Sequence, residues 1–99
     1  MDRSTVISFL ESSKSFLAVK YGIAKIGLFG SFASQSHNSK SDIDLVFELL
    51  PGRHIKLKQR IELEEHFSKQ LENRTIELLN RKYLNPVIRK AIENQIIYV

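Results

Sequence analysis

The segment that decides the fold reads IAKIGLFGSFASQSHNSKSDIDLVFEL, residues 23–49. Its first part, Ile23–Phe29, is rich in β-branched and aromatic residues and predicts a short strand, which the pair Gly30-Ser31 ends. The polar run Ser34–Ser41 has no hydrophobic period and is typical of a loop. Asp42–Leu49 alternates between apolar and polar positions and predicts a second strand, whose polar face is acidic where the strand begins.

The patterns on either side of this segment predict two helices and one more strand. Apolar residues at helical spacing predict a helix over Ser4–Tyr21, with Ser4 as its N-cap and Gly22 as its stop. Lys56–Leu71 has the clearest apolar stripe in the chain and predicts a second helix. Thr75–Leu79 alternates again and predicts a third strand.

The C-terminal part predicts a last helix and a short edge strand. Asparagine is a favoured N-cap and proline is tolerated in the first helical turn, so Asn85-Pro86 is expected to begin a helix that runs to about Asn94. Ile96–Val99 then predicts an edge strand. The order helix, strand, strand, helix, strand, helix predicts an α+β fold, with a small mixed β-sheet and helices packed on one face. At 99 residues the chain has room for one domain, residues 1–99.

Composition narrows the class of protein. Hydrophobic residues make up 42% of the chain and charged residues 26%, as in ordinary globular proteins. The chain has no cysteine, which excludes disulfides and thiolate metal sites, so any metal must be held by oxygen or imidazole. The apolar stretches are too short to span a membrane, and the first residues show no secretory signal. We therefore expect a cytoplasmic protein.

Basic residues exceed acidic ones, and the formal net charge is +4. They are scattered, with mild concentrations at Arg53–Arg60 and Arg81–Lys90. Most such side chains belong to solvated helix faces. A positive field would also suit a protein that handles triphosphates or nucleic acid. No aromatic residues are interleaved with a basic stripe, so charge alone does not indicate RNA or DNA binding.

Asp42 and Asp44 give the strongest indication of chemistry. Residues at i and i+2 of a strand point to the same face, so the two carboxylates converge on one spot and repel each other unless a cation binds them. Mg²⁺ prefers carboxylate and phosphate oxygens. Two such ions about 3.5–4 Å apart can bind both the attacking and the leaving oxygen of a displacement at phosphorus, as in polymerases. The pattern therefore predicts nucleotidyl transfer with two Mg²⁺ ions.

Three further positions belong to the predicted nucleotide site. Gly30 lets the backbone approach a phosphate closely, and Ser31 offers a hydroxyl and amide N–H groups to an anion if it begins a helical turn. A triphosphate would then lie between this turn and the metals held by Asp42 and Asp44. Ser41 either orients the Asp42 turn or is an ordinary turn serine.

A third carboxylate is normally needed to bind the catalytic metal and to help deprotonate the acceptor hydroxyl. Glu77 is the first candidate, because it lies on the polar face of the third predicted strand. Glu48 is the second, since it shares the face of Asp44, but it lies about 13 Å further along the strand. The histidines have no ligand spacing and are left out of the site: His37, His54 and His66.

These residues carry a resemblance to a known family. Gly30-Ser31-Phe32-Ala33 through Ser41-Asp42-Ile43-Asp44-Leu45 resembles the signature of the polymerase-β-like nucleotidyltransferase superfamily, in the small stand-alone form called minimal nucleotidyltransferase. The resemblance continues through Thr75–Leu79, at the place of the strand with the third carboxylate, and Leu84–Arg89, at the following helix. It covers about Ile23 to Val99, and it implies the polymerase-β-like fold with ATP as the donor.

The resemblance also implies a partner. Members like this are commonly the antitoxin of a helical HEPN-domain RNase toxin, and some transfer AMP from ATP to a tyrosine of that toxin. Whether the chain forms a homo-oligomer stays open. Two positions depart from the family pattern: Ser34-Gln35 stand where arginine and then glycine are usual, which removes a phosphate contact, and Glu77 stands where aspartate, one methylene shorter, is usual.

Two classes of function follow from these observations. In the first, the chain is an Mg²⁺-dependent enzyme that moves AMP or another nucleoside monophosphate from a triphosphate to a hydroxyl. In the second, it neutralises the toxin by binding alone, an alternative that Ser34 and Glu77 favour. A weaker third reading is transfer to a small molecule such as an aminoglycoside, or to the 3′ end of RNA.

Overall fold

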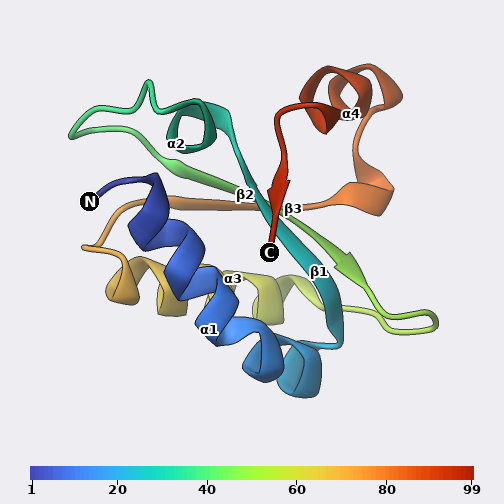
Figure 1. Ribbon diagram of the computed structural model, residues 1–99. Coiled ribbons are helices and arrows are strands. Elements are labelled where there is room, and N and C mark those ends of the chain that lie inside the picture. Colours follow the sequence, from blue (N-terminus) through green and yellow to red (C-terminus); the bar gives the residue numbers. More distant parts are fainter.

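A four-stranded mixed β-sheet forms the centre of the molecule in the computed structural model, which describes residues 1–99 (Figure 1). The strands are β1 (Ile23–Phe29), β2 (Ile43–Leu49), β3 (Ile76–Asn80) and β4 (Ile97–Tyr98), in the order β3-β2-β1-β4. β1 is antiparallel to both of its neighbours, β2 and β4, whereas β2 and β3 run parallel. The predicted mixed sheet and the terminal edge strand are therefore confirmed.

Two long helices, α1 (Arg3–Tyr21) and α3 (Leu57–Gln70), lie along one face of the sheet (Figure 1). The parallel pairing of β2 with β3 requires a crossover, and α3 supplies it. In the same view the short helix α4 (Pro86–Glu93) lies on the other side of the sheet. The short helix α2 (Gly30–Ser34) follows β1 and packs Phe32 and Ala33 into the core, where the Ala33 carbonyl accepts a hydrogen bond from Arg3 of α1. A 3₁₀ turn, η1 (Arg81–Tyr83), joins β3 to α4. No helix is both long and apolar enough to cross a membrane.

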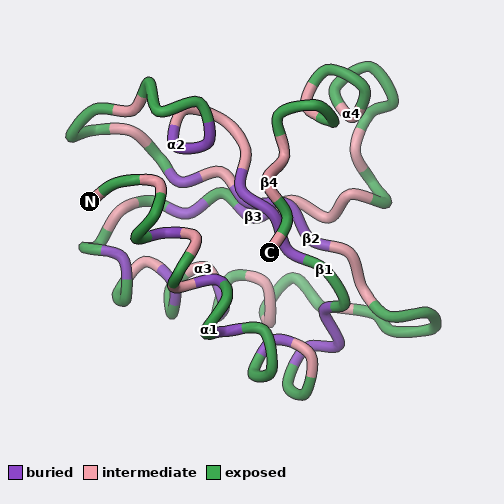
Figure 2. The backbone as a smooth tube through the Cα atoms, in the orientation of Figure 1, coloured by how far each residue is buried: buried purple, intermediate pink, exposed green.

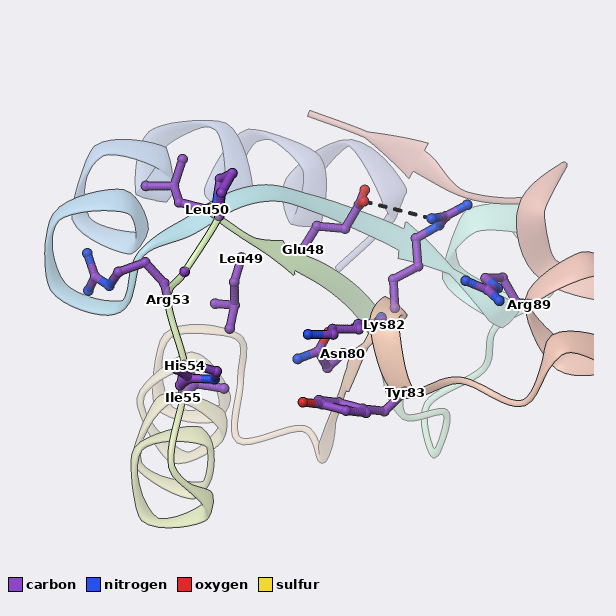
Figure 3. A pocket seen from close by; sticks show the side chains of 13 residues that line it. Glu48, Leu49, Leu50, Arg53, His54, Ile55, Asn80, Lys82, Tyr83 and Arg89 are labelled. Atoms are coloured by element: carbon purple, nitrogen blue, oxygen red, sulfur yellow. Dashed lines mark hydrogen bonds and ion pairs between the residues drawn. The ribbon is translucent and has the colours of Figure 1, made fainter.

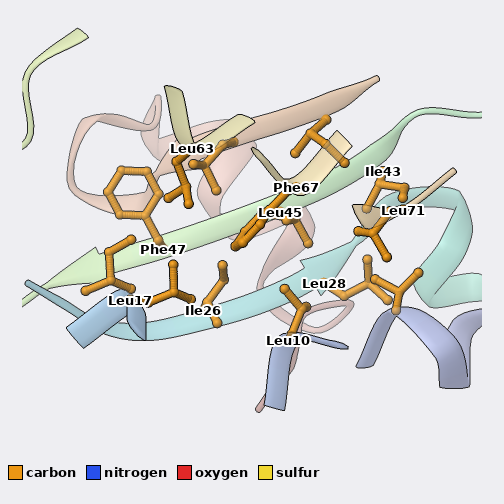
Figure 4. Close-up of a cluster of buried hydrophobic side chains, with 14 of the residues drawn as sticks. Leu10, Leu17, Ile26, Leu28, Ile43, Leu45, Phe47, Leu63, Phe67 and Leu71 are labelled. Atoms are coloured by element: carbon orange, nitrogen blue, oxygen red, sulfur yellow. The ribbon is translucent and has the colours of Figure 1, made fainter. Parts of the chain in front are cut away.

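The hydrophobic core lies between the sheet and the two long helices (Figure 4). Alternate residues of the two central strands point into it, and the apolar stripes of α1 and α3 close it from the other side. Figure 2 shows the same division, with buried backbone in the strands and on the inner sides of these helices and exposed backbone along α4. The side chains labelled in Figure 4 are Leu10, Leu17, Ile26, Leu28, Ile43, Leu45, Phe47, Leu63, Phe67 and Leu71.

The helix boundaries follow local capping chemistry. Gly22 ends α1 in the left-handed conformation, with φ 69°, and Asn85 caps α4 by accepting a hydrogen bond from the Val87 amide. Both agree with the prediction. The prediction of Ser4 as the first N-cap is wrong, because the helix begins one residue before it and Asp2 accepts the hydrogen bond of the Thr5 amide instead.

The C-terminal segment covers part of the sheet face that α1 and α3 leave open. Val46 points to the same face as Asp44, yet it is fully buried. In the sheet register Val46 is paired with Gly27 and Leu79. A Cβ built on Gly27 would lie 2.5 Å from Cγ2 of Ile96, so the glycine makes room for the chain that crosses it. Near the start of β2, Asp44 on the same face is only half-buried.

A residue with unfavourable backbone geometry follows α2. Gln35 adopts φ 61° as the C-cap of this helix, and its amide donates to the carbonyl oxygens of Ser31 and Phe32. The left-handed region is strained for a residue with a side chain and free of strain for glycine. This geometry gives a physical reason for glycine to be usual at this position in the family that the sequence resembles.

We therefore expect Gln35→Gly to raise the free energy of unfolding by about 0.5 kcal/mol, because relief of about 1–2 kcal/mol of left-handed strain exceeds the extra chain entropy that glycine loses on folding. Urea unfolding followed by circular dichroism measures the change. Ser39→Gly is the matched control in the same loop, because Ser39 is exposed and is not among the residues with positive φ. The control should be destabilising, and a loss of stability in Gln35→Gly would contradict the argument.

Candidate active site

The sheet register places two of the predicted carboxylates side by side. β2 and β3 are parallel, and Asp44 is paired with Glu77 across them. Paired residues of neighbouring strands project to the same face of a sheet, and here this is the face opposite the core, because Ile43 and Leu45 are buried on the other. The predicted third carboxylate therefore lies next to the predicted metal ligand, although 32 residues separate them in the chain.

Gly30 completes this arrangement on the other side of Asp44. It directly follows Phe29, which is paired with Asp44 across β1 and β2. Gly30 has φ 72°, and a Cβ built on it would overlap the Oδ2 atom of Asp44. The Asp44 carboxylate can therefore occupy its position only because Gly30 has no side chain. The sequence predicts only that Gly30 lets a phosphate approach closely. Its contact with the Asp44 carboxylate depends on the register of β1 and β2.

The Asp44 carboxyl lies in an environment that disfavours its charge. Its pKa is raised from 3.8 to about 6, first by burial, then by a hydrogen bond with the Glu77 side chain and by the negative charges of Glu77 and Asp42. None of these three carboxylates has a lysine, arginine or histidine nitrogen within 4.0 Å. The site therefore concentrates negative charge and leaves it without a basic partner.

Asp42 lies just before β2 and is exposed. Its charge contributes to the raised pKa of Asp44, but the three carboxylates are not gathered around one point as a group of ligands. The structure thus brings Asp44 and Glu77 together and leaves Asp42 at the edge of the pair. The donor set fits a divalent cation chemically, because it consists of carboxylate oxygens without basic partners, the ligands that Mg²⁺ prefers.

The two predicted nucleotide-site serines have different surroundings. Ser31 is half-buried in the first turn of α2, next to Gly30, where its backbone carbonyl accepts a hydrogen bond from the Ser36 amide. The Ser41 hydroxyl accepts a hydrogen bond of 2.9 Å from the Asn38 amide. Ser41 is therefore engaged in the turn before Asp42, as both alternatives for this serine predict.

Arg74 holds the loop between α2 and β2 in place, and sequence reasoning missed it. Its Nη1 donates hydrogen bonds to the carbonyl oxygens of Asn38 and Ser41, at 3.0 and 2.9 Å. Its guanidinium lies over the Phe32 ring, 5.0 Å from the centroid, and His37 stacks on that ring at 4.0 Å. The loop carries Asp42 at its end, so Arg74 helps to position the first aspartate. Nothing local marks this role, because the partners lie more than 30 residues away.

Glu48, the second choice for the third carboxylate, lies elsewhere. It is on the same strand as Asp44, but four residues further along, which is about 13 Å. Its carboxylate is 3.8 Å from the guanidinium of Arg81. Glu48 therefore does not join the acidic pair, and it lines a separate cavity beyond the far end of the sheet.

The raised pKa of Asp44 has a consequence for stability. An acid whose pKa is higher in the folded protein stabilises the fold below its unfolded pKa, and that contribution is lost as the pH rises through the folded value. For Asp44 the loss occurs between about pH 3.8 and 6. The full displacement corresponds to about 3 kcal/mol, which solvent screening of a part-exposed carboxyl reduces to about 1 kcal/mol.

We therefore expect Asp44→Asn to raise the free energy of unfolding by about 1 kcal/mol at pH 8 in the absence of divalent cations, and by less at pH 4.5. Urea unfolding at the two pH values, with a chelator present, measures both changes. Glu65→Gln is the control, since Glu65 is exposed on α3 and takes part in no ion pair. Equal effects of Asp44→Asn at both pH values would contradict the electrostatic explanation.

Comparison with known proteins identifies the family of the chain. Residues 10–99 match the nucleotidyltransferase domain family. The protein adenylyltransferase MntA of Thermococcus cleftensis is 32% identical over 94 residues, which cover 93% of this chain and 90% of that protein. The structure of a candidate minimal nucleotidyltransferase, 26% identical, superposes with a TM-score of 0.78 and covers 98% of this chain and 95% of its own.

Two toxin–antitoxin crystal structures share the fold at lower identity. One, solved with AMP-PNP, is 19% identical, with a TM-score of 0.64 over 89% of this chain and 64% of that chain. The other is an MntA-HpeT variant in which two aspartates, two positions apart, are replaced by glutamate; it is 17% identical, with a TM-score of 0.69 over 99% and 71% of the chains. By the match to the family over nine-tenths of its length, the chain belongs to the nucleotidyltransferase domain family, as a minimal nucleotidyltransferase.

Proposed function

We propose that the chain transfers AMP, or another nucleoside monophosphate, from a triphosphate to a hydroxyl of a partner protein and acts as an antitoxin. The adjacent carboxylates of Asp44 and Glu77, seated beside Gly30, are the observation that carries this proposal. The likeness to MntA, a protein adenylyltransferase, and to chains of toxin–antitoxin complexes supports the partner. AMP-PNP in one of those complexes supports a nucleotide as donor.

The proposed roles follow from position. Asp42, Asp44 and Glu77 would hold two Mg²⁺ ions, and Asp42, exposed and without a hydrogen bond to another side chain, is free to turn toward the pair. When bound, the ions neutralise the charge of the triphosphate and of the leaving pyrophosphate. Glu77 accepts the proton of the attacking hydroxyl, because it is the exposed member of the pair.

The phosphates belong at the turn beside this pair. Ser31 offers its hydroxyl, and Gly30 beside it adds no side chain of its own to the turn. Ser41 and Arg74 act by holding the loop that ends at Asp42. In the proposed reaction the acceptor oxygen forms a bond to the α-phosphorus, the bond to the β-phosphate oxygen breaks, and pyrophosphate leaves.

Within this proposal, the acceptor is a tyrosine of a helical HEPN-type toxin. The toxin–antitoxin structures that share the fold support a protein as the acceptor. Incubation with α-labelled ATP, Mg²⁺ and the product of the neighbouring reading frame tests the reaction. Label should appear on the partner and disappear when Mg²⁺ is chelated, and a partner left unlabelled by a folded, Mg²⁺-supplied protein would count against it.

A second candidate is neutralisation of the toxin by binding alone. It is favoured by Ser34, which offers no guanidinium to a phosphate, and by the absence of a ready group of three ligands around the acidic pair. Co-expression with the toxin separates the two candidates. If the Asp42→Asn and Asp44→Asn double variant still protects cells, the chemistry is dispensable. A panel with aminoglycosides and RNA 3′ ends as acceptors tests the weaker reading of a non-protein substrate.

A further inference from the structure

A cavity of about 490 Å³ lies at the opposite end of the sheet from the acidic pair (Figure 3). One wall is the turn after β2, residues 51–55, and the other is formed by the end of β3, η1 and Arg89 of α4. Glu48 and Leu49 lie between the two walls. Tyr83 extends from the second wall toward His54 and Ile55 on the first, so the cavity has an aromatic and aliphatic interior.

The cavity gathers positive charge from distant parts of the chain. The mild basic concentrations of the sequence, Arg53–Arg60 and Arg81–Lys90, contribute one wall each. Four permanent cations line the cavity, and the single carboxylate, Glu48, is already paired with one of them, Arg81. The other three have no carboxylate within 4.0 Å: Arg53, Lys82 and Arg89. Arg53 lies against Gly22, so Lys82 and Arg89 are the cations that the cavity leaves available.

The cavity and the proposed site both include residues of β2. Asp44 and Glu48 project to the same face of β2, one at the acidic pair and the other at the cavity. The separation of about 13 Å corresponds to four residues of an extended chain. Because the C-terminal segment covers Val46 between these two positions, a partner whose hydroxyl lies at Asp44 must pass around this segment and reaches the cavity with residues more than four positions away.

We propose that this cavity docks an acidic segment of the acceptor protein, a short run of Asp or Glu residues flanked by apolar ones. The inference rests on the proposed function for the identity of the acceptor. Arg89 and Lys82 would bind the carboxylates, and the side chains of Leu49, Ile55 and Tyr83 would contact the apolar residues. Docking here would hold the acceptor against this protein and raise the local concentration of its hydroxyl at the acidic pair.

Two observations favour a protein segment over single-stranded RNA. Proteins that bind single strands without sequence preference stack successive bases on several aromatic side chains, whereas this cavity offers only the phenol ring of Tyr83 and the imidazole of His54. Its interior is also partly aliphatic, through Leu49, Leu50 and Ile55, which suits apolar side chains better than phosphates.

Fluorescence anisotropy at low ionic strength tests the docking. The probe is a labelled ten-residue peptide in which two residues are leucine and the others are glutamate. We expect the double variant Lys82→Glu and Arg89→Glu to weaken binding at least tenfold. The control, Lys14→Glu with Lys69→Glu, makes the same change of net charge on exposed parts of α1 and α3 and should retain most of the affinity. Circular dichroism checks that both variants fold.

The outcomes separate this inference from the proposed function. Asp44→Asn should not weaken peptide binding, because Asp44 does not line the cavity and the substitution removes a negative charge that repels an acidic peptide. With the protein acceptor, the charge-reversed cavity should raise KM about tenfold at unchanged kcat. Absence of peptide binding, an equal loss in the control, or tighter binding of an oligoadenylate of the same charge would each overturn the acidic-segment docking. A peptide that binds while no acceptor is labelled would instead leave the docking standing and count against the catalytic proposal.

Discussion

Replacing Asp44 with asparagine is expected to lower the rate of nucleotidyl transfer by about 10³-fold, because a metal-bound carboxylate at the reacting phosphate contributes several kcal/mol of stabilisation to the transition state. Asparagine keeps the size and one oxygen but loses the negative charge that a cation requires. Asp44 is the most sensitive position of the three, since it alone touches both Gly30 and Glu77. Initial rates of label transfer from ATP to the partner measure the loss.

The same substitution should make the protein more stable without cations, as argued above, so lost activity cannot be attributed to unfolding. Glu65→Gln on α3 is again the matched control and should keep its full rate. Asp42→Asn should also reduce the rate strongly, and Glu77→Asp should retain activity, because it restores the carboxylate that the family usually has at this position. An Asp44→Asn protein that transfers label at the normal rate would show that the acidic pair does not take part in the reaction.

Replacing Gly30 with alanine is expected to lower the free energy of unfolding by about 3 kcal/mol and to abolish transfer. Two costs add: the left-handed conformation costs a residue with a side chain about 1–2 kcal/mol, and overpacking against a neighbour typically costs about 1–3 kcal/mol more. The neighbour here is the Asp44 carboxylate, which must move to make room for the new methyl group. A domain of this size has only about 5–15 kcal/mol of stability in total, so the loss is large.

Gly52→Ala separates the two costs. Gly52 also has a positive φ, of 77°, but a Cβ built on it would meet no atom within 4 Å. It should therefore lose only the backbone contribution, about 1 kcal/mol. Urea unfolding of both variants measures the difference, and combining Gly30→Ala with Asp44→Ala should recover the part caused by overlap. Equal losses at Gly30 and Gly52 would mean that the Asp44 carboxylate is not seated against the glycine.

Together these variants address how the candidate active site is assembled. A carboxylate held by burial and by a neighbouring acid, without any basic partner, stores unfavourable electrostatic energy that a bound cation can release. This arrangement explains why the expected effects on stability and on activity have opposite signs at Asp44. At Gly30 both effects have the same sign, because the substitution disturbs the position of the carboxylate and leaves its charge in place.

Much of the fold was predictable from local patterns. The strands at Ile23–Phe29 and Thr75–Leu79, and the helix over Lys56–Leu71, agree with the structure to within a residue at each end. Alternation along β2 correctly assigned Asp44 to the face opposite Ile43 and Leu45. The predicted N-cap of α1 was wrong: the sequence indicates Ser4, whereas Asp2 caps the helix. Such errors arise because several polar residues in succession can each cap the same helix.

The sequence by itself determined the elements and the acid spacing, because hydrophobic period, capping and i, i+2 geometry are local properties of the chain. The tertiary structure alone decided that Glu77 lies beside Asp44, that Gly30 seats the Asp44 carboxylate, and that Arg74 holds the loop before it. It also decided that two scattered basic stretches share one cavity. These relations depend on the order and direction of strands joined by long connections, and a parallel pair such as β2 and β3 meets only after its crossover helix has packed on the sheet.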